Sequence, residues 1–146
     1  MTIDTVSLWF ARAIPAPTHR TFDIQNGVHA EEYGEYLAAL VGSSEESEIT
    51  LRNLQEAVER FATALKSGKL SVKIGDRKAA LDAICDQIVT ATGCGHMADL
   101  KVAEALKRVN ESNWSKFNED GFPFFDANGK IAKGPNYKKP DLEGLY

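Results

Sequence analysis

The sequence predicts an all-α protein, a helical bundle of about five helices followed by a small C-terminal hairpin and an extended tail. Apolar residues recur at helical spacing in five separate stretches, and glycine, proline or polar segments separate these stretches. A chain of 146 residues is long enough for one domain with a sizeable core. We therefore expect a single domain, with the bundle over residues 1–113 and the hairpin and tail over residues 114–146.

The N-terminal half of the chain is expected to hold three helices separated by polar segments. Pro15 and Pro17 end the first helix, and Gly42 supplies a stop for the second. The expected helices span residues 5–14, 28–41 and 49–66. The expected connections are an ordered polar loop over 18–27 and a linker, SSEES, over 43–47.

The fourth predicted helix, residues 79–93, is apolar almost all the way round and contains no Lys, Arg or Glu between Ala79 and Thr92. A helix that is hydrophobic on every side is typical of a buried one. It nevertheless carries Asp82 and Asp86, one turn apart on the same face. Because a buried carboxylate needs a cation or a proton, this pair indicates either a divalent metal or aspartates bonded to arginines or helix caps elsewhere.

The C-terminal half contains a fifth predicted helix, after which the helical spacing of apolar residues ends. The fifth helix is expected over residues 97–113, after a break at 66–75 that contains a short extended piece at 70–74. Phe124-Phe125 and Ile131-Ala132 flank an Asn-Gly pair, the pattern of a small hairpin. The tail that follows is polar, contains two prolines and has no helical period.

Composition narrows the class of protein. The net charge of -4 argues against a nucleic-acid-binding protein, which normally has a basic excess, but is compatible with a small anionic ligand held through a metal. Cys85 and Cys94 cannot form a disulfide framework, and with Cys85 in the buried helix both are expected to be free thiols. No apolar run is long enough to span a membrane, and the N-terminus lacks the basic start of a signal peptide. We expect a cytoplasmic protein with no membrane partner.

The second predicted helix carries the acidic pattern EExxE at Glu31, Glu32 and Glu35. Spacings of three and four place these side chains on one side of a helix, which by periodicity alone is typical of a solvated face. The helix has no lysine or arginine to pair with them, although a surface helix usually mixes both signs of charge. If this face packed against Asp82 and Asp86, the converging carboxylates would favour Mg²⁺ or Mn²⁺.

Polar residues at the end of the fifth helix and in the tail could complement such a metal. Amides bind phosphate oxygens or sugar hydroxyls, and lysine supplies a mobile positive charge for phosphate. An ordinary polar helix end and a basic tail remain the alternatives. The candidates are Asn110, Asn113 and Lys116 in the helix and Lys133, Asn136 and Tyr137 in the tail. Four aromatic residues could stack on a base but are at the spacing of core residues: Trp9, Phe10, Trp114 and Phe117.

Taken together, these motifs resemble one enzyme family. EEYGE at 31–35 and DAICD at 82–86 are similar to the acidic signature of the all-α nucleoside triphosphate pyrophosphohydrolases of the MazG type. The segments 112–116 and 119–142 resemble a compact branch of that family common in bacteriophages, and within it the purine-directed MazZ group. The resemblance covers most of the chain and is clearest from Asp82 to Leu142.

The resemblance implies a Mg²⁺-dependent (or Mn²⁺-dependent) cut between the α and β phosphates of a nucleoside triphosphate, giving the monophosphate and pyrophosphate. It implies metal ligands at Glu32, Glu35 and Asp86, with Asp82 as a fourth. Glu31 would orient the attacking water or lie behind the ligands, and Lys116 with Asn113 would hold phosphate. The tail residues Lys133, Asn136 and Tyr137 would close over the nucleotide. Members of the family are homo-oligomers, commonly dimers or tetramers.

The chain departs from the family pattern at two places. The second acidic motif is often ExxD, but residue 83 is an alanine and the acid lies four positions before Asp86. The helix expected at 49–66 also makes the gap between the two acidic motifs longer than usual. Within the resemblance we expect dGTP, GTP or dATP as substrate. The alternatives are a pyrimidine triphosphate or phosphoribosyl-ATP on the same fold, or a non-catalytic helical interaction protein.

Overall fold

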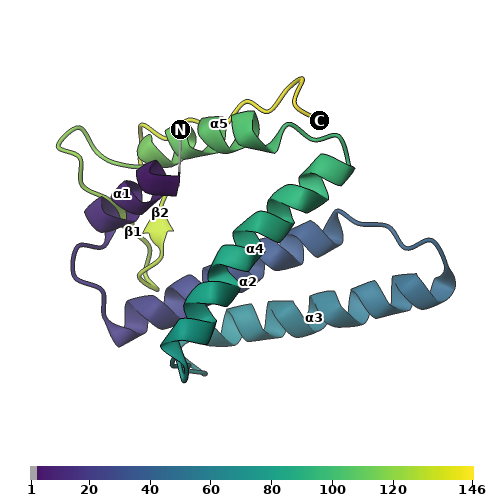
Figure 1. The fold of residues 1–146 in the computed structure, drawn as a ribbon. Coiled ribbons are helices and arrows are strands. Elements are labelled where there is room, and N and C mark those ends of the chain that lie inside the picture. The colour runs from purple at the N-terminus through teal and green to yellow at the C-terminus, as the bar shows by residue number, and fades with distance from the viewer. Residues whose placement is uncertain (1–2) are drawn as a thin grey trace. The chain divides into compact units, whose positions relative to one another are not determined.

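The computed structural model describes residues 3–146 and confirms the all-α fold class (Figure 1). Its described part contains five helices and one two-stranded hairpin. The helices are α1 (Ile3–Ala13), α2 (His19–Ala38), α3 (Glu45–Ser67), α4 (Arg77–Met97) and α5 (Val102–Trp114). The strands are β1 (Phe124–Phe125) and β2 (Ile131–Ala132).

The chain forms two compact units. The first unit contains the chain up to Pro15 together with Lys73–Phe124 and Ile131–Tyr146, and therefore holds α1, α4, α5 and most of the C-terminal region. The second unit contains Ala16–Val72 and Phe125–Lys130, which is the α2–α3 pair and the turn of the hairpin.

In the second unit, α2 and α3 pack side by side as an antiparallel pair (Figure 1). The buried residues of α2 include Ile24, Gly27 and Leu37, and those of α3 are Ala62 and Leu65. A Cβ atom on Gly27 would lie 2.9 Å from the carbonyl oxygen of Ala62. The absence of a side chain at this position therefore lets the two helix backbones approach closely.

The polar loop expected over residues 18–27 is wrong, because this segment is the first half of α2. Thr18 caps the helix: its side chain accepts a hydrogen bond from the Thr21 backbone N–H, and the Thr21 hydroxyl pairs with the Thr18 N–H in return. This reciprocal pair satisfies donors that a helix start otherwise leaves unpaired. A threonine takes the place that glutamate or glutamine usually holds, which conceals the motif in the sequence.

The linker expected over residues 43–47 is also wrong in part, because α3 already begins at Glu45. Ser44 and Ser47 form the same reciprocal cap, and Glu45, Glu46 and Glu48 place negative charge in the first turn. Both features stabilise a helix N-terminus. Gly68 ends the helix in the left-handed conformation with φ of 78°.

The extended piece expected at residues 70–74 forms no strand, and a buried carboxylate fixes its first part. Asp23, only 4% exposed, accepts hydrogen bonds from the Val72 backbone N–H at 2.9 Å and from the Ser71 hydroxyl at 2.8 Å. The Val72 bond is the largest cause that lowers the pKa of Asp23; burial opposes it, and Ser71 and His19 lower it further. Asp23 thus holds the chain after α3 against α2.

The first unit is built on an aromatic core in which α1 meets α5. Trp9 stacks on Phe117 with ring centroids 5.7 Å apart, and Ala13 completes the buried cluster. Trp9 Nε1 also donates to the Asn113 carbonyl at 2.9 Å. Phe10 and Trp114 pack against this cluster, so the interpretation of the four aromatic residues as core is confirmed.

The burial expected for the fourth helix is wrong. Every residue of α4 from Leu81 to Thr92 is exposed, and among the described residues of the first unit the main helix packed against α4 is α5. Leu81 is 65% exposed and Val89 68%, and Cys85 is exposed as well. The apolar composition of this helix therefore does not correspond to burial within the described part of the chain.

The boundary between the last two helices differs from the expectation. Helix α4 continues through Gly93 and Gly95 to Met97, and α5 begins only at Val102. A Cβ on Gly95 would lie 2.1 Å from Val102 Cγ2, so this glycine permits close packing at the α4–α5 corner. Asp99, with φ of 57°, reverses the chain between the helices.

The hairpin predicted around the Asn-Gly pair is confirmed. Asp126 Oδ1 accepts hydrogen bonds from the backbone N–H groups of Asn128 and Lys130, and Gly129 adopts φ of 83°. The tail beyond β2 follows α5 without regular structure. In the described chain, none of the helices combines the length and the apolar character that crossing a membrane requires.

Candidate functional site

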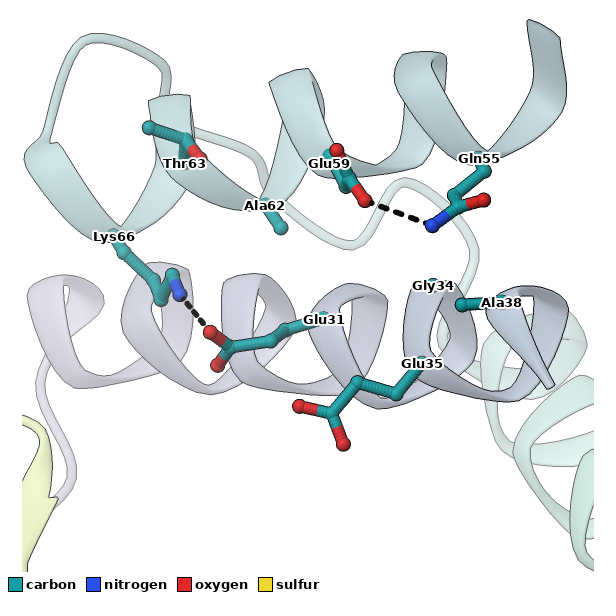
Figure 2. Close-up of a pocket in the computed structure, with 9 residues that line it drawn as sticks. All are labelled: Glu31, Gly34, Glu35, Ala38, Gln55, Glu59, Ala62, Thr63 and Lys66. Carbon is teal, nitrogen blue, oxygen red and sulfur yellow. Dashed lines mark hydrogen bonds and ion pairs between the residues drawn. The ribbon is translucent and has the colours of Figure 1, made fainter. Parts of the chain in front are cut away.

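A groove runs between α2 and α3 in the second unit (Figure 2). Its volume is about 370 Å³, and small side chains on both helices make room for it. The lining residues are Glu31, Gly34, Glu35, Ala38, Gln55, Glu59, Ala62, Thr63 and Lys66. Two of the three glutamates of the EExxE pattern therefore lie along a groove.

Glu31 lies at one end of the groove, between two lysines. Its Oε1 accepts a hydrogen bond from Lys66 Nζ at 2.5 Å and its Oε2 from Lys130 Nζ at 2.8 Å. Burial alone would raise the pKa of Glu31, but the bonds from Lys130 and Lys66 outweigh it, so the pKa is lowered. Glu31 is therefore ionised at neutral pH, with one lysine on each oxygen.

Two further glutamates, Glu35 and Glu59, line the groove away from Lys66. Glu59 accepts a hydrogen bond from Gln55 Nε2 at 3.1 Å, whereas the Glu35 carboxylate is bonded to none of the side chains drawn in Figure 2. Within residues 3–146, neither glutamate forms an ion pair with a lysine or arginine. The groove thus has Lys66 at one end, while Glu59 lies midway along it and the Glu35 carboxylate points away from α3 (Figure 2).

Glu32, the third acid of the pattern, is exposed on α2 and is not among the residues that line the groove. Asp82 and Asp86 are exposed on α4 in the first unit, one turn apart, and neither makes a salt bridge within the described chain. The first unit alone therefore brings two carboxylates together on α4, as the spacing predicts.

These carboxylates fit a hard divalent cation by type, because Mg²⁺ and Mn²⁺ prefer carboxylate and water oxygens. Nothing competes for Glu32, Glu35, Asp82 or Asp86 among the ion pairs of residues 3–146. In the same residues, no three acidic, histidine or cysteine side chains lie close enough to hold a metal ion together. Helices α2 and α4 thus each carry two carboxylates of the type that Mg²⁺ and Mn²⁺ prefer.

The polar residues at the end of α5 have different surroundings. Asn110 is 2% exposed, and its side-chain amide donates to the Thr5 hydroxyl at 3.3 Å, so it links α5 to α1 inside the first unit. Asn113 is half-buried, and its backbone carbonyl oxygen accepts a hydrogen bond from Trp9 Nε1. Lys116 is half-buried, with Nζ 5.8 Å from the centre of the Trp9 ring.

The tail residues lie beside this end of α5. Gly134 packs so closely that a Cβ there would be 3.0 Å from the Lys116 carbonyl oxygen. Further along, the Ser112 hydroxyl donates to the Lys138 carbonyl at 2.7 Å, and the Lys138 N–H donates to Ser115 Oγ at 2.8 Å. Gly134 of the tail therefore lies beside the backbone of Lys116.

Within that segment, Lys133 and Tyr137 contact each other, whereas Asn136 is exposed. Lys133 Nζ lies 4.8 Å above the centre of the Tyr137 ring, a cation–π distance. An exposed ammonium group held over a ring stays available to an anion in solvent.

Sequence reasoning missed two residues that line the groove, Glu59 and Lys66, and a third, Lys130, that is bonded to Glu31. Glu59 and Lys66 lie on the polar side of α3, where a charged residue usually indicates only solvent exposure. Lys130 is 99 positions from its partner, and no local pattern links the two. Pairing α2 with α3 in an antiparallel register would have brought Lys66 and Glu59 opposite Glu31 and Glu35.

Comparison with known proteins identifies no relative: no family model, curated protein or solved structure matches the chain. The second unit offers a groove lined by Lys66 and three glutamates, and the first unit offers two exposed aspartates together with amide and lysine side chains near the end of α5.

Proposed function

We propose that this chain is a metal-dependent nucleoside triphosphate pyrophosphohydrolase, which converts a nucleoside triphosphate to the monophosphate and pyrophosphate. The observation that carries the proposal is the bonding of Glu31 to Lys66 and Lys130 beside Glu35 and Glu59, two carboxylates that form no ion pair within residues 3–146. A phosphate chain with a bound divalent cation has the complementary pattern, because the phosphates favour lysine and the cation favours carboxylates. The MazG-like acidic motifs support the same class.

The resemblance implies that Glu32 and Glu35 of α2, and Asp82 and Asp86 of α4, would be the residues that hold Mg²⁺ or Mn²⁺. When bound, the metal would neutralise phosphate charge and lower the pKa of a water. Glu31 has a different task, because both of its oxygens already accept bonds from lysines. We assign it to orienting the attacking water.

The first unit would supply contacts to the nucleotide. Lys116 would offset the charge that develops on the phosphates, and Asn113 would donate its amide to a phosphate or sugar oxygen. Lys133, Asn136 and Tyr137 would close over the bound nucleotide. Asn110 contributes indirectly, since its bond to Thr5 holds α5 against α1.

The proposed substrate is a purine nucleotide, dGTP, GTP or dATP. This choice depends on the likeness of the C-terminal half to the MazZ group of the phage branch. The alternative substrates are a pyrimidine triphosphate and phosphoribosyl-ATP, which would use the same acids and lysines.

We propose that the protein acts as a homo-oligomer, a dimer or a tetramer, with α4 in the interface. Leu81, Ile84 and Ile88 recur at i, i+3 and i+7 on α4 and are 65%, 51% and 47% exposed. An uninterrupted apolar surface of this kind is typical of a protein interface. A second copy placed on α4 would also bring further carboxylates to Asp82 and Asp86.

The same exposed surface favours one rival, a non-catalytic helical interaction protein. The two proposals differ in what the carboxylates do. For the enzyme, Glu35→Gln and Asp86→Asn each lower pyrophosphate release by about a hundredfold or more, because one metal ligand is lost. For the interaction protein, no nucleotide is hydrolysed at all.

Matched controls separate the loss of a ligand from a general loss of charge. Glu45→Gln on α3 and Asp120→Asn in the first unit make the same chemical changes at exposed positions outside the proposed site. We expect both controls to keep the parent rate. Equal activity in Glu35→Gln, Asp86→Asn and the controls would contradict the proposed role of the acids.

A further inference from the structure

Two ammonium groups share one carboxylate at the end of the α2–α3 groove. Lys66 reaches Glu31 from the end of α3, and Lys130 reaches it from the hairpin turn. The three groups together carry one net positive charge, and their side chains remain 24%, 38% and 30% exposed for Lys66, Lys130 and Glu31. The cluster is therefore accessible to solvent, and its net charge of one positive unit is not neutralised by Glu31.

The neighbouring cation is used differently. Arg20 donates from its guanidinium group to the backbone carbonyls of Leu65 (2.7 Å) and Lys66, where it closes the C-terminal end of α3. These bonds are to the main chain and fix the arginine in place. Lys66 and Lys130 are bonded to a side chain instead, through long flexible stems that can rotate to another anion.

The backbone that carries Lys130 is itself held. Asp126 Oδ1 accepts from the Lys130 backbone N–H at 3.0 Å, and the Asp126 N–H donates to the Lys130 carbonyl at 2.9 Å. The Lys130 ammonium group can thus leave Glu31 by side-chain rotation while the turn stays formed.

We propose that Lys66 and Lys130 bind the phosphate chain of the substrate, and that Glu31 is the internal anion which the phosphates displace. A phosphate chain carries more charge than one carboxylate and offers several oxygens, so it can bond both lysines at once. Glu59, which lines the groove from α3, would then face the cation that accompanies the phosphates. This inference deepens the proposed function and depends on it for the identity of the ligand.

The test is the affinity of the full-length protein for inorganic pyrophosphate in magnesium buffer, measured by isothermal titration calorimetry. Lys66→Ala and Lys130→Ala each remove one phosphate contact, and we expect about tenfold weaker binding from each. Glu31→Gln removes the competing anion, and we expect about fivefold tighter binding, which corresponds to about 1 kcal/mol. Lys69→Ala, an exposed lysine of the same unit, is the control for loss of charge and is expected to bind as the parent does.

Weaker pyrophosphate binding by the lysine variants together with tighter binding by Glu31→Gln would exclude a purely structural role for the cluster. If the three residues only tie α2 to α3 and to the hairpin turn, Glu31→Gln would weaken binding as the lysine variants do, and that result would overturn the proposal. Weakening by Lys69→Ala equal to that by Lys66→Ala and Lys130→Ala would overturn it too, because the effect would then be general electrostatics.

Nucleotide hydrolysis is scored separately. Suppose that the parent hydrolyses nucleotides and that all variants bind pyrophosphate equally well. This result would leave the proposed function in place and reject the lysine pair as the phosphate site. No hydrolysis together with the predicted signs of binding would keep the pair as a polyphosphate site and reject the enzyme.

Discussion

Lys130 Nζ lies 2.8 Å from Glu31 Oε2, which bonds the hairpin turn to the middle of α2 across 99 positions of sequence. With Lys66 on the other carboxylate oxygen, this contact makes Glu31 the point at which two helices and a turn of the second unit meet. Glu31 and Glu35 belong to the same sequence pattern but differ in their partners. Glu31 is neutralised by lysines, and Glu35 is not.

The lowered pKa of Glu31 gives the stability of the protein a defined dependence on pH. Because the folded pKa lies below the ordinary value of 4.5, the ion pairs stabilise the fold fully above that value and are lost as pH falls through the folded pKa. We expect Glu31→Gln to cost about 1 kcal/mol of unfolding free energy at neutral pH, since the cluster is partly exposed. Urea unfolding at several pH values checks this. A difference between parent and variant that persists unchanged in acid would contradict it.

Gly27 and Gly34 lie seven residues apart on α2 and face α3 at different distances. A Cβ on Gly27 would meet the Ala62 carbonyl at 2.9 Å, whereas on Gly34 it would lie 3.6 Å from Val58 Cγ1. We expect Gly27→Ala to destabilise by about 1–3 kcal/mol through overpacking and Gly34→Ala to stabilise by about 0.5–1 kcal/mol through helix propensity. Thermal unfolding of the two variants compares them directly. The same sign for both would show that the α2–α3 packing is not as described.

Leu65 is fully buried between α2 and α3, with no exposed surface. Leu65→Ala should cost about 2–5 kcal/mol, because it removes buried methyl groups and leaves a cavity. Leu54 on the same helix is 41% exposed, and Leu54→Ala should change stability by no more than about 0.5 kcal/mol. Chemical denaturation of both variants gives the comparison, and similar losses would mean that α3 buries a different face.

The exposed apolar side of α4 predicts an oligomer. Light scattering should give a dimer or tetramer for the parent, and Ile84→Lys, in the middle of that side, should shift it to the monomer because a charge in an apolar interface is costly. Phe122→Lys is the control, since Phe122 is 64% exposed in the same unit but outside α4. A parent that stays monomeric at high concentration would contradict the proposed interface.

The sequence was sufficient for the fold class and for the hairpin, because both depend on local signals. Helical spacing defined the five helices, and the Asn-Gly pair defined the turn that ends at Gly129. The start of α2 was missed because its cap pairs two threonines, and the start of α3 because its cap pairs two serines. These short polar side chains have the composition of a loop.

The candidate site was predictable only in part. The spacing of Glu31, Glu32 and Glu35 predicted one acidic side of α2, but not that Glu31 is paired with lysines while Glu35 is not. That difference depends on the register of α3 and on the hairpin turn, which are tertiary relationships. The apolar composition of α4 predicted burial wrongly, since composition alone does not show whether other parts of the chain cover a helix.

The central claim is that this protein cuts nucleoside triphosphates between the α and β phosphates with the help of a divalent metal. The most direct measurement is the release of pyrophosphate and phosphate from the common ribo- and deoxynucleoside triphosphates, with Mg²⁺ and with EDTA. We predict pyrophosphate and a nucleoside monophosphate from dGTP or dATP, and no release in EDTA. A folded sample that releases no pyrophosphate from any of them with Mg²⁺ or Mn²⁺ would contradict the claim.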